Sequence, residues 1–360
     1  MRVLLDARPI PGHRLGVAQY VLRLVELAGR CCDLEVLAKR QDVDDLAAPA
    51  HVSRPLPRPL RVASEATLDG WRVNRLRPDV FHGVHYTLPP GLRVPATVTF
   101  HDATMLTMPE VHERSKRLWF QRAIPVGVAR ASRVICVSES ARQGAIDHAG
   151  ADPARTHTVP LAVDHDRYRP GPGGARPDGV TAICPGPYLL WVGALEPRKD
   201  VPTLIDAFER VAGDLPHDLV LVGPDAWGTE AITERIARSA VRDRIRRTGW
   251  VDEELKADLY RHADAFAYPS LAEGFGLPVL EAMACGTPTV TTTGSAPEEV
   301  AGDAALLVAP GDADGLAAAI GEAVGPAGER LRAAGPARAA RYTWEATAQG
   351  TVDVWRLACA

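Results

Sequence analysis

Two carboxylates flank a glycine-containing turn in the second half of the chain. Glu273 and Glu281 are separated by seven residues, among them Gly274, Gly276 and Pro278. Glycine lets a backbone come close to a ligand, and proline suits the first turn of a helix, where its missing N–H costs nothing. The pattern predicts a helix over residues 277–284 that starts directly after this turn.

The start of that helix is a candidate ligand site. The main-chain amides of Phe275, Gly276 and Leu277 would point outward, which suits an anion or the hydroxyls of a sugar. Glu281 lies about one turn further along, among apolar neighbours. A buried carboxylate is costly unless it is paired or faces a ligand. We therefore interpret Glu273 and Glu281 as two acids at different depths of one pocket.

Two adjacent cations form a second candidate group. The chain has only four lysines, and one of them, Lys199, follows Arg198 soon after an apolar run at Tyr188–Val192. These two side chains could neutralise the negative charge that develops on a departing phosphate. Removing one such electrostatic donor typically raises a reaction barrier by ~2.7–4 kcal/mol.

Several other chemical motifs are missing from the sequence. No G-x-G-x-x-G follows the first apolar run, and neither G-x-x-x-x-G-K-[ST] nor G-x-S-x-G occurs. Two Asp-x-Asp pairs, at residues 164–166 and 312–314, lie beside a loop and at a predicted helix start. Aspartate at a helix start caps main-chain amides. We therefore expect no metal site and no resident cofactor.

Short apolar runs alternate with amphipathic stretches along the whole chain. Such alternation is typical of an α/β fold, in which helices cover both faces of a parallel sheet. We expect strands at Val3–Leu5, Leu34–Leu37, Val80–His82, Thr97–His101, Val134–Val137, Tyr188–Val192, Asp218–Val222, Ile245–Gly249, Ala265–Tyr268 and Thr289–Thr291. We expect helices at Val17–Ala28, Arg117–Ala131, Val201–Ala212, Glu230–Val241, Glu253–His262, Leu277–Ala284, Asp312–Val324, Glu329–Arg341 and Trp344–Leu357.

Residues 171–179 interrupt this pattern most strongly. Seven of the eleven residues from Arg169 to Gly179 are proline or glycine, which sustain neither a helix nor a central strand. A chain of 360 residues also exceeds the size of one hydrophobic core. We therefore predict two domains, residues 1–170 and 180–343, joined by a linker at 171–179.

Composition and net charge argue against several classes of protein function. Apolar residues make up 46% of the chain and charged residues 24%, as in an ordinary globular protein. The net charge of −4 gives no sign of a nucleic-acid partner. No uninterrupted apolar window reaches the ~18 residues of a membrane span. Arg8 and Pro9 interrupt the N-terminal apolar run too early for a signal peptide, so we expect a cytoplasmic protein.

Taken together, these motifs resemble the retaining glycosyltransferases of family 4, which have the GT-B fold. The glutamate pair resembles the family's E-x7-E signature, and Trp191–Asp200 is similar to its phosphate-binding loop. Gly249–Asp252 resembles its nucleobase loop. Further similarities lie at Gly16–Tyr20, His101–Asp102, Val137–Arg142 and Val159–Asp164.

The resemblance implies two Rossmann-like domains that face each other across a cleft. The N-terminal domain would hold the acceptor, the C-terminal domain would bind the sugar nucleotide, and the final helix, residues 344–360, would pack back on the N-terminal domain. Closure of the domains would accompany catalysis.

The resemblance also implies roles for individual residues. Glu281 would accept hydrogen bonds from the ribose hydroxyls, and Glu273 would contact the donor sugar. His101 would meet the sugar at its 6-hydroxyl, and Asp102 would orient that histidine or bind sugar or acceptor. Arg198 and Lys199 would hold the diphosphate. Many relatives carry arginine directly after the glycine that corresponds to Gly193, whereas this chain has Ala194. Further donor contacts would come from Gly16, Gly193, Val251, Gly274, Phe275, Gly276 and Leu277.

The predicted function is therefore metal-independent hexosyl transfer from a nucleotide sugar, which is a substrate and not a cofactor. GDP-mannose is the favoured donor, with UDP- and dTDP-sugars as alternatives. The acceptor would be a glycan, a lipid-linked sugar or a small molecule. A GT-B sugar phosphorylase, with Lys256 as its pyridoxal-phosphate lysine, and a non-catalytic sugar-nucleotide-binding protein are the other hypotheses.

Arginines interleaved with apolar residues over 54–77 suggest a peripheral membrane contact. Such a basic, partly apolar surface would suit an anionic bilayer that carries a lipid-linked acceptor. An ordinary solvated surface is the alternative, because arginine is common throughout this chain.

Overall fold

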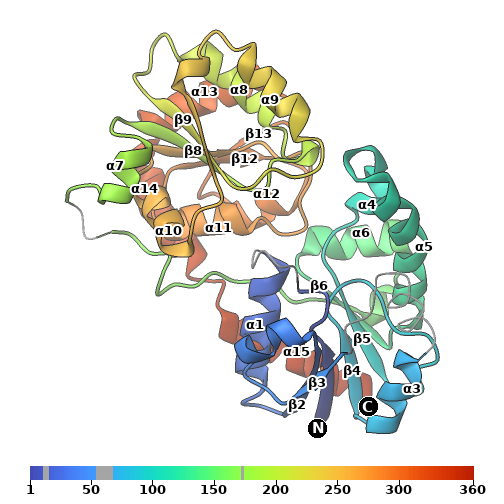
Figure 1. Ribbon diagram of the computed structural model, residues 1–360. Coiled ribbons are helices and arrows are strands. Elements are labelled where there is room, and N and C mark those ends of the chain that lie inside the picture. The colour runs from blue at the N-terminus through green and yellow to red at the C-terminus, as the bar shows by residue number, and fades with distance from the viewer. Residues whose placement is uncertain (11–15, 54–67, 172–173) are drawn as a thin grey trace. The chain divides into compact units, whose positions relative to one another are not determined.

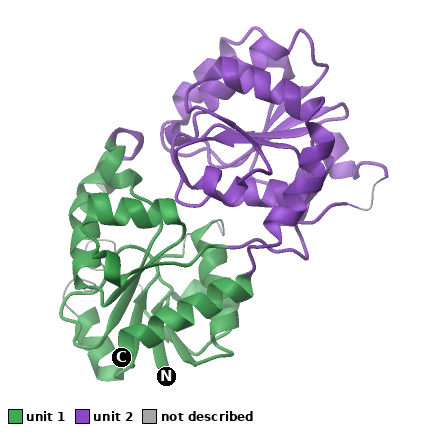
Figure 2. Cartoon of the chain, turned by 180° about the vertical axis from the view of Figure 1, so that it is seen from behind, with its two compact units in different colours: residues 1–109, 114–161, 344–360 green, residues 110–113, 162–343 purple. Residues whose placement is uncertain are grey.

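The computed structural model of the chain describes residues 1–10, 16–53, 68–171 and 174–360. These residues form two compact units, each built around a parallel sheet (Figure 1). Unit 1 comprises residues 1–109, 114–161 and 344–360, and unit 2 comprises residues 110–113 and 162–343 (Figure 2).

The sheet of unit 1 has seven strands, all parallel to their neighbours. From one edge to the other they are β3 (Ala50–Val52), β2 (Asp33–Ala38), β1 (Arg2–Asp6), β4 (Val80–Gly83), β5 (Ala96–Phe100), β6 (Arg133–Cys136) and β7 (Thr156–Thr158). β5 is buried along its whole length, so both faces of the sheet are covered. The order of the strands reverses between β1 and β4, where sheets of this class bind ligands.

The helices of unit 1 come from both ends of the chain. They are α1 (Val17–Ala28), α3 (Asp69–Leu76), α4 (Thr104–Thr107), α5 (Arg114–Arg130), α6 (Glu139–Ala149) and α15 (Trp344–Cys359). α15 packs against α1 and against β4, β5 and β6. Its Trp355 is fully buried and meets the His82 ring edge-on at 5.4 Å. The last helix is therefore part of the core of unit 1.

The sheet of unit 2 repeats this plan with six parallel strands. Their order is β10 (Ile245–Gly249), β9 (Asp218–Val222), β8 (Tyr188–Val192), β11 (Ala265–Tyr268), β12 (Thr289–Thr292) and β13 (Leu306–Val308). The helices are α7 (Asp178–Ile183), α8 (Val201–Val211), α9 (Thr229–Ala237), α10 (Glu253–His262), α11 (Leu277–Ala284), α12 (Ala296–Ala301), α13 (Ala313–Val324) and α14 (Gly328–Ala339). The order reverses between β8 and β11.

The predicted α/β class with two parallel-sheet domains is confirmed. The ten expected strands and the nine expected helices are present, with ends shifted by a few residues. β3, β7 and β13 were not predicted, and each has only three residues. Such short edge strands have too few residues to show a periodic pattern. Along the part of the chain that is described, no helix is both long and apolar enough to cross a bilayer.

The chain passes from unit 1 to unit 2 at Leu161, before the proline- and glycine-rich segment. Residues 162–169 belong to unit 2 because Tyr168 and Arg167 are anchored there. The Tyr168 hydroxyl donates to Glu253 at 2.8 Å, and Arg167 forms an ion pair with Glu254 at 2.9 Å. The segment predicted as the linker therefore falls within the span of unit 2, and α7 already begins at Asp178.

Candidate active site

The candidate catalytic residues of unit 2 follow β8 and β11, the two strands between which the strand order reverses. We call this place the switch point of unit 2. β8 and β11 are neighbours in the sheet, although their sequences are far apart. The chain after β8 leads into a short 3-10 turn at Pro197–Lys199, and the chain after β11 leads to Glu273. Because parallel strands end at the same edge, Lys199 and Glu273 meet there.

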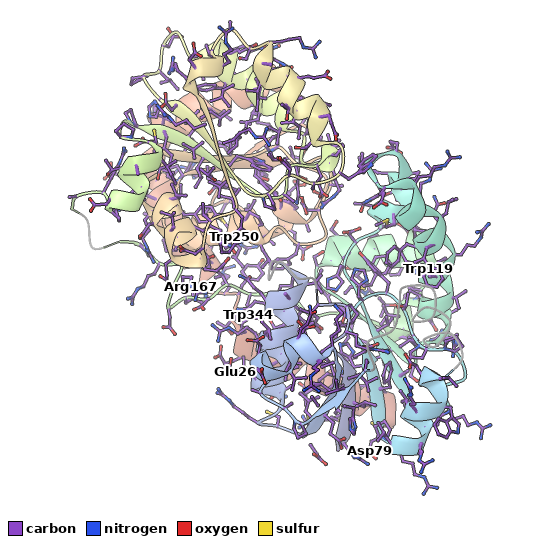
Figure 3. The ribbon with its side chains drawn as sticks, viewed as in Figure 1. Glu26, Asp79, Trp119, Arg167, Trp250 and Trp344 are labelled. Carbon is purple, nitrogen blue, oxygen red and sulfur yellow. The ribbon has the colours of Figure 1, made fainter. Side chains whose placement is uncertain are left out.

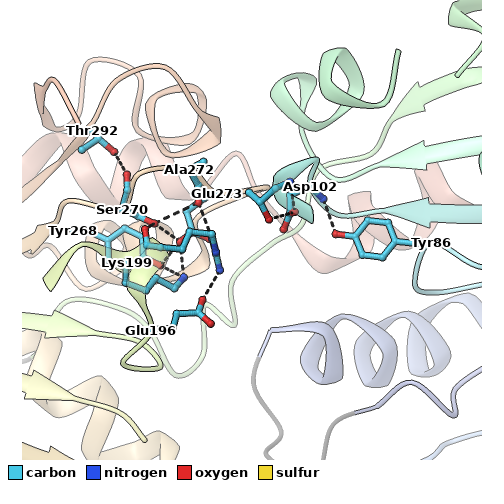
Figure 4. A network of polar contacts seen from close by, with 11 residues as sticks. Tyr86, Asp102, Glu196, Lys199, Tyr268, Ser270, Ala272, Glu273 and Thr292 are labelled. Carbon is cyan, nitrogen blue, oxygen red and sulfur yellow. Dashed lines mark hydrogen bonds and ion pairs between the residues drawn. The ribbon is translucent and has the colours of Figure 1, made fainter. Parts of the chain in front are cut away.

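Glu273 is surrounded by donors (Figure 4). Lys199 Nζ donates to Glu273 Oε1 at 2.5 Å, and Arg198 Nη1 lies 2.8 Å from Oε2. Tyr268 and Ser270 donate their hydroxyls to Oε1 at 3.0 and 2.6 Å. The side chain of Glu273 retains only 10% of its exposure. This carboxylate is therefore fixed in position before any ligand arrives.

The two cations keep Glu273 ionised. Burial alone would raise the pKa of its carboxyl, but Arg198 and Lys199 together hold that pKa well below its usual range. Burial and the charge of Arg198 lower the pKa of the Lys199 ammonium, whereas Glu273 raises it. Glu273 thus has two cations beside it, and the N–H groups of these cations suit an anionic ligand.

Arg198 also has hydrogen-bond partners other than Glu273. Its Nη2 donates to Glu196 Oε1 at 2.8 Å, and its Nη1 donates to the Ala272 carbonyl oxygen at 2.7 Å. Asp200, the next residue after Lys199, has a left-handed backbone (φ 49°). A non-glycine residue in this conformation costs of order 1–3 kcal/mol and is common at functional sites. It makes the sharp change of direction between the 3-10 turn and α8.

The glycine-containing turn enters α11 as predicted. Gly276 precedes the helix with φ 98°, which L side chains rarely adopt, and a Cβ there would lie 3.2 Å from Pro297. Phe275 is 5% exposed, and its ring meets Tyr342 edge-on. Phe275 could therefore contribute to a ligand only through its main chain. The first N–H groups of the helix, which have no intrahelical acceptor, lie at this end.

Glu281 lies in a second, separate polar cluster. It is buried in α11, and its oxygens contact two side chains of α10: Lys256 Nζ lies 3.3 Å from Oε1, and the Tyr260 hydroxyl donates to Oε2 at 3.1 Å. Lys256 also forms an ion pair with Glu253 at 3.0 Å. Burial raises the pKa of the Glu281 carboxyl, although Lys256 counteracts that rise.

Two predicted donor-binding loops follow strands β8 and β10. Gly193 follows β8, and a Cβ on Gly223, after β9, would lie 1.8 Å from the Gly193 carbonyl oxygen. The two loops can therefore approach each other only with glycine at residue 223. Val251 follows β10 and is half-buried, whereas its neighbour Trp250, labelled in Figure 3, is 57% exposed.

His101 follows β5 in unit 1. Its Nε2 donates to the Val84 carbonyl oxygen at 2.8 Å, so the neutral ring has its free lone pair on Nδ1. Burial lowers the pKa of His101, although Val84 and Asp102 counteract that change. The Asp102 carboxylate accepts from the N–H and hydroxyl of Thr104, at 2.9 and 2.6 Å. Asp102 therefore stabilises the turn into α4, a role that the sequence analysis did not assign.

Gly16 immediately precedes α1 and has φ 51°, a conformation that favours glycine. It lies next to residues 11–15, which are outside the described residues.

Sequence reasoning missed several residues of both clusters. Tyr268 and Ser270 touch Glu273, and Tyr260 and Glu253 belong to the cluster of Glu281. Polar side chains at the end of the buried strand at 265–268 were the available signal for the first pair. The rarity of lysine could have indicated that Lys256 has a specific partner. Among the described residues, no group of three or more histidine, cysteine, aspartate or glutamate side chains could hold a metal ion.

Two family models match this chain. Residues 15–167 match the model of Glycosyltransferase Family 4, and residues 186–325 match that of Glycosyl transferases group 1. The chain belongs to the family 4, group 1 glycosyltransferases. The two matches follow one another along the chain, one for each predicted domain.

This glycosyltransferase is similar to other glycosyltransferases over most of its length. It is 28% identical over 383 residues to O-antigen chain mannosyltransferase B of Escherichia coli, with 99% of this chain and 100% of that protein aligned. It is 35% identical over 242 residues to D-inositol 3-phosphate glycosyltransferase 2 of Catenulispora acidiphila. That alignment covers 63% of this chain and 56% of the relative, so the chain spans about half of the relative's length.

Solved structures share the fold of this glycosyltransferase. Anabaena Alr3699/HepE in complex with UDP and glucose has a TM-score of 0.77 at 20% identity, covering 98% of both chains. WaaG, a glycosyltransferase involved in lipopolysaccharide biosynthesis, has a TM-score of 0.74 at 17% identity, covering 98% of this chain and 99% of WaaG. These similarities support the GT-B fold for both units together.

Proposed function

We propose that this glycosyltransferase moves a hexose from a nucleotide sugar to an acceptor hydroxyl, with retention of configuration and without a metal ion. The observation that carries the proposal is the group of Arg198, Lys199 and Glu273 at the switch point of unit 2. It combines two cations for a diphosphate with one fixed carboxylate for sugar hydroxyls.

In the proposed reaction the bond between C1 of the sugar and the β-phosphate oxygen breaks, and its electron pair goes to the diphosphate. The acceptor oxygen bonds to C1 on the same face, and its proton passes to the departing phosphate oxygen. Guanidinium and ammonium groups carry five and three donors, more than Glu273 engages. Arg198 and Lys199 can therefore contact the phosphate while still holding Glu273.

GDP-mannose is the proposed donor. Asp6–Pro9, His101–Asp102 and Leu195–Lys199 resemble bacterial polysaccharide mannosyltransferases. The alignment with the E. coli mannosyltransferase over its full length supports the same choice. HepE binds UDP and glucose in its structure, which keeps a UDP-hexose as the second candidate.

We further propose that α5 contacts an anionic membrane on the acceptor side. This helix has five cationic residues and no acidic one. Leu118, Trp119 and Val126 are 48, 55 and 55% exposed, and Arg122 and Arg130 are exposed beside them. Figure 3 shows Trp119 on the surface. A helix with exposed apolar and basic residues suits the interface of a bilayer. Of the basic region suggested by the sequence, residues 54–67 lie outside the described residues.

A panel of nucleotides tests the donor. The melting temperature would be measured with GDP, UDP, ADP and dTDP and with their sugar forms, in EDTA. A ligand at 100 times its Kd stabilises the folded state by about 2.7 kcal/mol, so the correct base should stand out. We expect the largest shift with GDP and slow release of GDP and α-mannose from GDP-mannose. Inversion to β-mannose, or activity that requires added metal, would contradict the proposal.

The other hypotheses give different results in the same panel. A phosphorylase would show an absorbance band near ~400 nm from its Schiff base and would need a free lysine. The ion pairs of Lys256 with Glu253 and Glu281 argue against that role. A non-catalytic binding protein would be stabilised by a nucleotide sugar but would neither transfer nor hydrolyse it.

A further inference from the structure

Lys256 lies in α10 and forms ion pairs both within that helix and with the neighbouring helix α11. Its ammonium contacts Glu253 in the preceding turn and Glu281 in the neighbouring helix α11, at 3.0 and 3.3 Å. The side chain retains 7% of its exposure, and Glu281 retains 5%. It also lies 5.4 Å from the centre of the Tyr168 ring. A lysine this deeply buried is rare unless it is paired.

Glu281 is the residue in this cluster that needs such a cation. Burial disfavours its charged form, and Glu253 adds a like charge nearby. The other titratable groups around it are Tyr260, Tyr168 and Cys285, and none of them supplies a positive charge. Lys256 is therefore the cation, among the described residues in contact with Glu281, that can keep it a carboxylate.

Both oxygens of the Glu281 carboxylate keep acceptor positions beyond their contacts with Lys256 and Tyr260. Lys256 contacts Oε1 and Tyr260 donates to Oε2, so within the described part of the chain each oxygen has one side-chain partner. A carboxylate has about four acceptor positions, and two of them remain for a ligand. Two hydroxyls on adjacent carbon atoms, as in ribose, can donate to both oxygens at once. A protonated carboxyl would have fewer acceptor positions for these two hydroxyls.

α10 also connects this carboxylate to the predicted nucleobase loop. The loop containing Val251 leads directly into α10, whose first residue is Glu253 and whose start is capped by Asp252, which accepts from the Leu255 N–H at 2.8 Å. Lys256 follows within the first turns of the same helix. A base held by the loop therefore has its ribose close to the helix that carries Lys256.

We propose that Lys256 is a positioning residue for nucleotide recognition: it holds Glu281 as an oriented carboxylate that reads the ribose 2′- and 3′-hydroxyls of the donor. The inference rests on the proposed function, since it requires a ribonucleotide donor. The inference predicts that loss of the Lys256 charge removes the preference for ribose over deoxyribose, in addition to any loss of protein stability.

The test compares dissociation constants by calorimetry for GDP and 2′-deoxy-GDP, and for UDP and 2′-deoxy-UDP. A hydrogen bond to a charged group contributes ~1.5–3 kcal/mol, so wild type should favour the ribonucleotide about 10- to 100-fold. In Lys256→Met the preference should fall to within about threefold of unity, the value expected for Glu281→Gln. Lys256→Arg should restore most of the preference.

Arg244→Met is the matched control. Arg244 is another cation of unit 2, and its guanidinium donates to the carbonyl oxygens of Ala212, Leu215 and His217. Its loss should lower stability and leave the ribose preference unchanged. Should Lys256→Met fail to fold, Tyr260→Phe, which removes only the hydroxyl that donates to Oε2, should still lower the preference.

The outcomes of this test distinguish the role of Lys256 from the role of Glu281 and from the proposed donor class. If wild type prefers the ribonucleotide and Lys256→Met keeps that preference, the role of Lys256 is wrong and the proposed function stands. If wild type binds GDP and UDP no better than their 2′-deoxy forms, the role of Glu281 is wrong and the inference falls with it. If neither GDP nor UDP binds to wild type, the proposed donor class is wrong as well.

Discussion

Lys199 and Glu273, 74 positions apart in the sequence, form a buried ion pair at the edge of the sheet of unit 2. Both side chains retain only 10% of their exposure. The pair joins the loop after β8 to the loop after β11, so the cations proposed for the phosphate and the acid proposed for the sugar form one rigid group.

Breaking this pair should affect both activity and stability. Lys199→Met should lower kcat about 10²- to 10³-fold, as for loss of one electrostatic donor in other enzymes. It should also lower the free energy of unfolding, by less than the ~3–5 kcal/mol of a fully unpaired buried charge, because Glu273 loses Lys199 but keeps Arg198. Steady-state kinetics and urea unfolding measure the two effects.

The double variant Lys199→Met/Glu273→Gln separates these effects. It should regain part of the lost stability, because the carboxylate that lost Lys199 becomes a neutral amide and Arg198 keeps Glu196, while activity stays low. Recovery of activity together with stability would mean that the pair has only a structural role.

His101 should remain neutral across the physiological range. Burial lowers its pKa from the usual value near 6.5, so protonation requires a more acidic pH. A plot of kcat/KM against pH should therefore show no loss centred near pH 6.5 as the pH falls. His101→Gln, which lacks a titrating group, is the control. A loss near pH 6.5 that disappears in this variant would contradict the prediction.

Stability should decrease with acid because of His82. Burial lowers the pKa of His82 to about 3, and its Nδ1 lies 2.8 Å from Thr97 Oγ1. Between pH 6.5 and 3 the unfolded chain binds a proton that the folded protein does not, so stability falls as the pH falls through this window. At pH 5 this effect lowers the free energy of unfolding by about 2 kcal/mol relative to neutral pH.

Melting temperatures at pH 7 and pH 5 measure this effect. The difference should be smaller in His82→Gln than in wild type. Part of it should persist, because burial also lowers the pKa of His85 to about 3. An unchanged pH difference in the variant would show that His82 is not responsible.

The proposed membrane contact predicts a selective effect of one exposed tryptophan. Trp119→Glu should reduce co-sedimentation with vesicles that contain anionic phosphatidylglycerol severalfold, and added salt should weaken binding of the wild type. Trp227→Glu alters a tryptophan of unit 2 that is 44% exposed, and it should have no effect. Binding that does not depend on the anionic lipid content would argue against the contact.

Local sequence signals predicted much of the fold and the positions of the candidate residues. The helix after Gly276 starts where the glycine–proline pattern indicated, because backbone preferences act within a few residues. The long, apolar strands at the centre of each sheet were predicted for the same reason, whereas the three-residue edge strands were not.

Contacts between distant residues could not be predicted in this way. Glu273 meets Lys199 only because β11 lies beside β8, and Lys256 meets Glu281 only because α10 packs against α11. A motif shows which side chains are present, but the order of the strands decides which of them become partners. The assigned chemical roles of Glu273, His101, Arg198 and Lys199 stay predictions until they are measured.

The position of α15 has a consequence for biosynthesis. A ribosome makes β1 to β7 first, yet their core also requires Trp355, which is fully buried in the last helix. The contiguous segment 162–343 can complete its own sheet before α15 is synthesised. The half of the protein that is translated first is therefore the half that finishes folding last, and until then it exposes an apolar surface that a chaperone could bind.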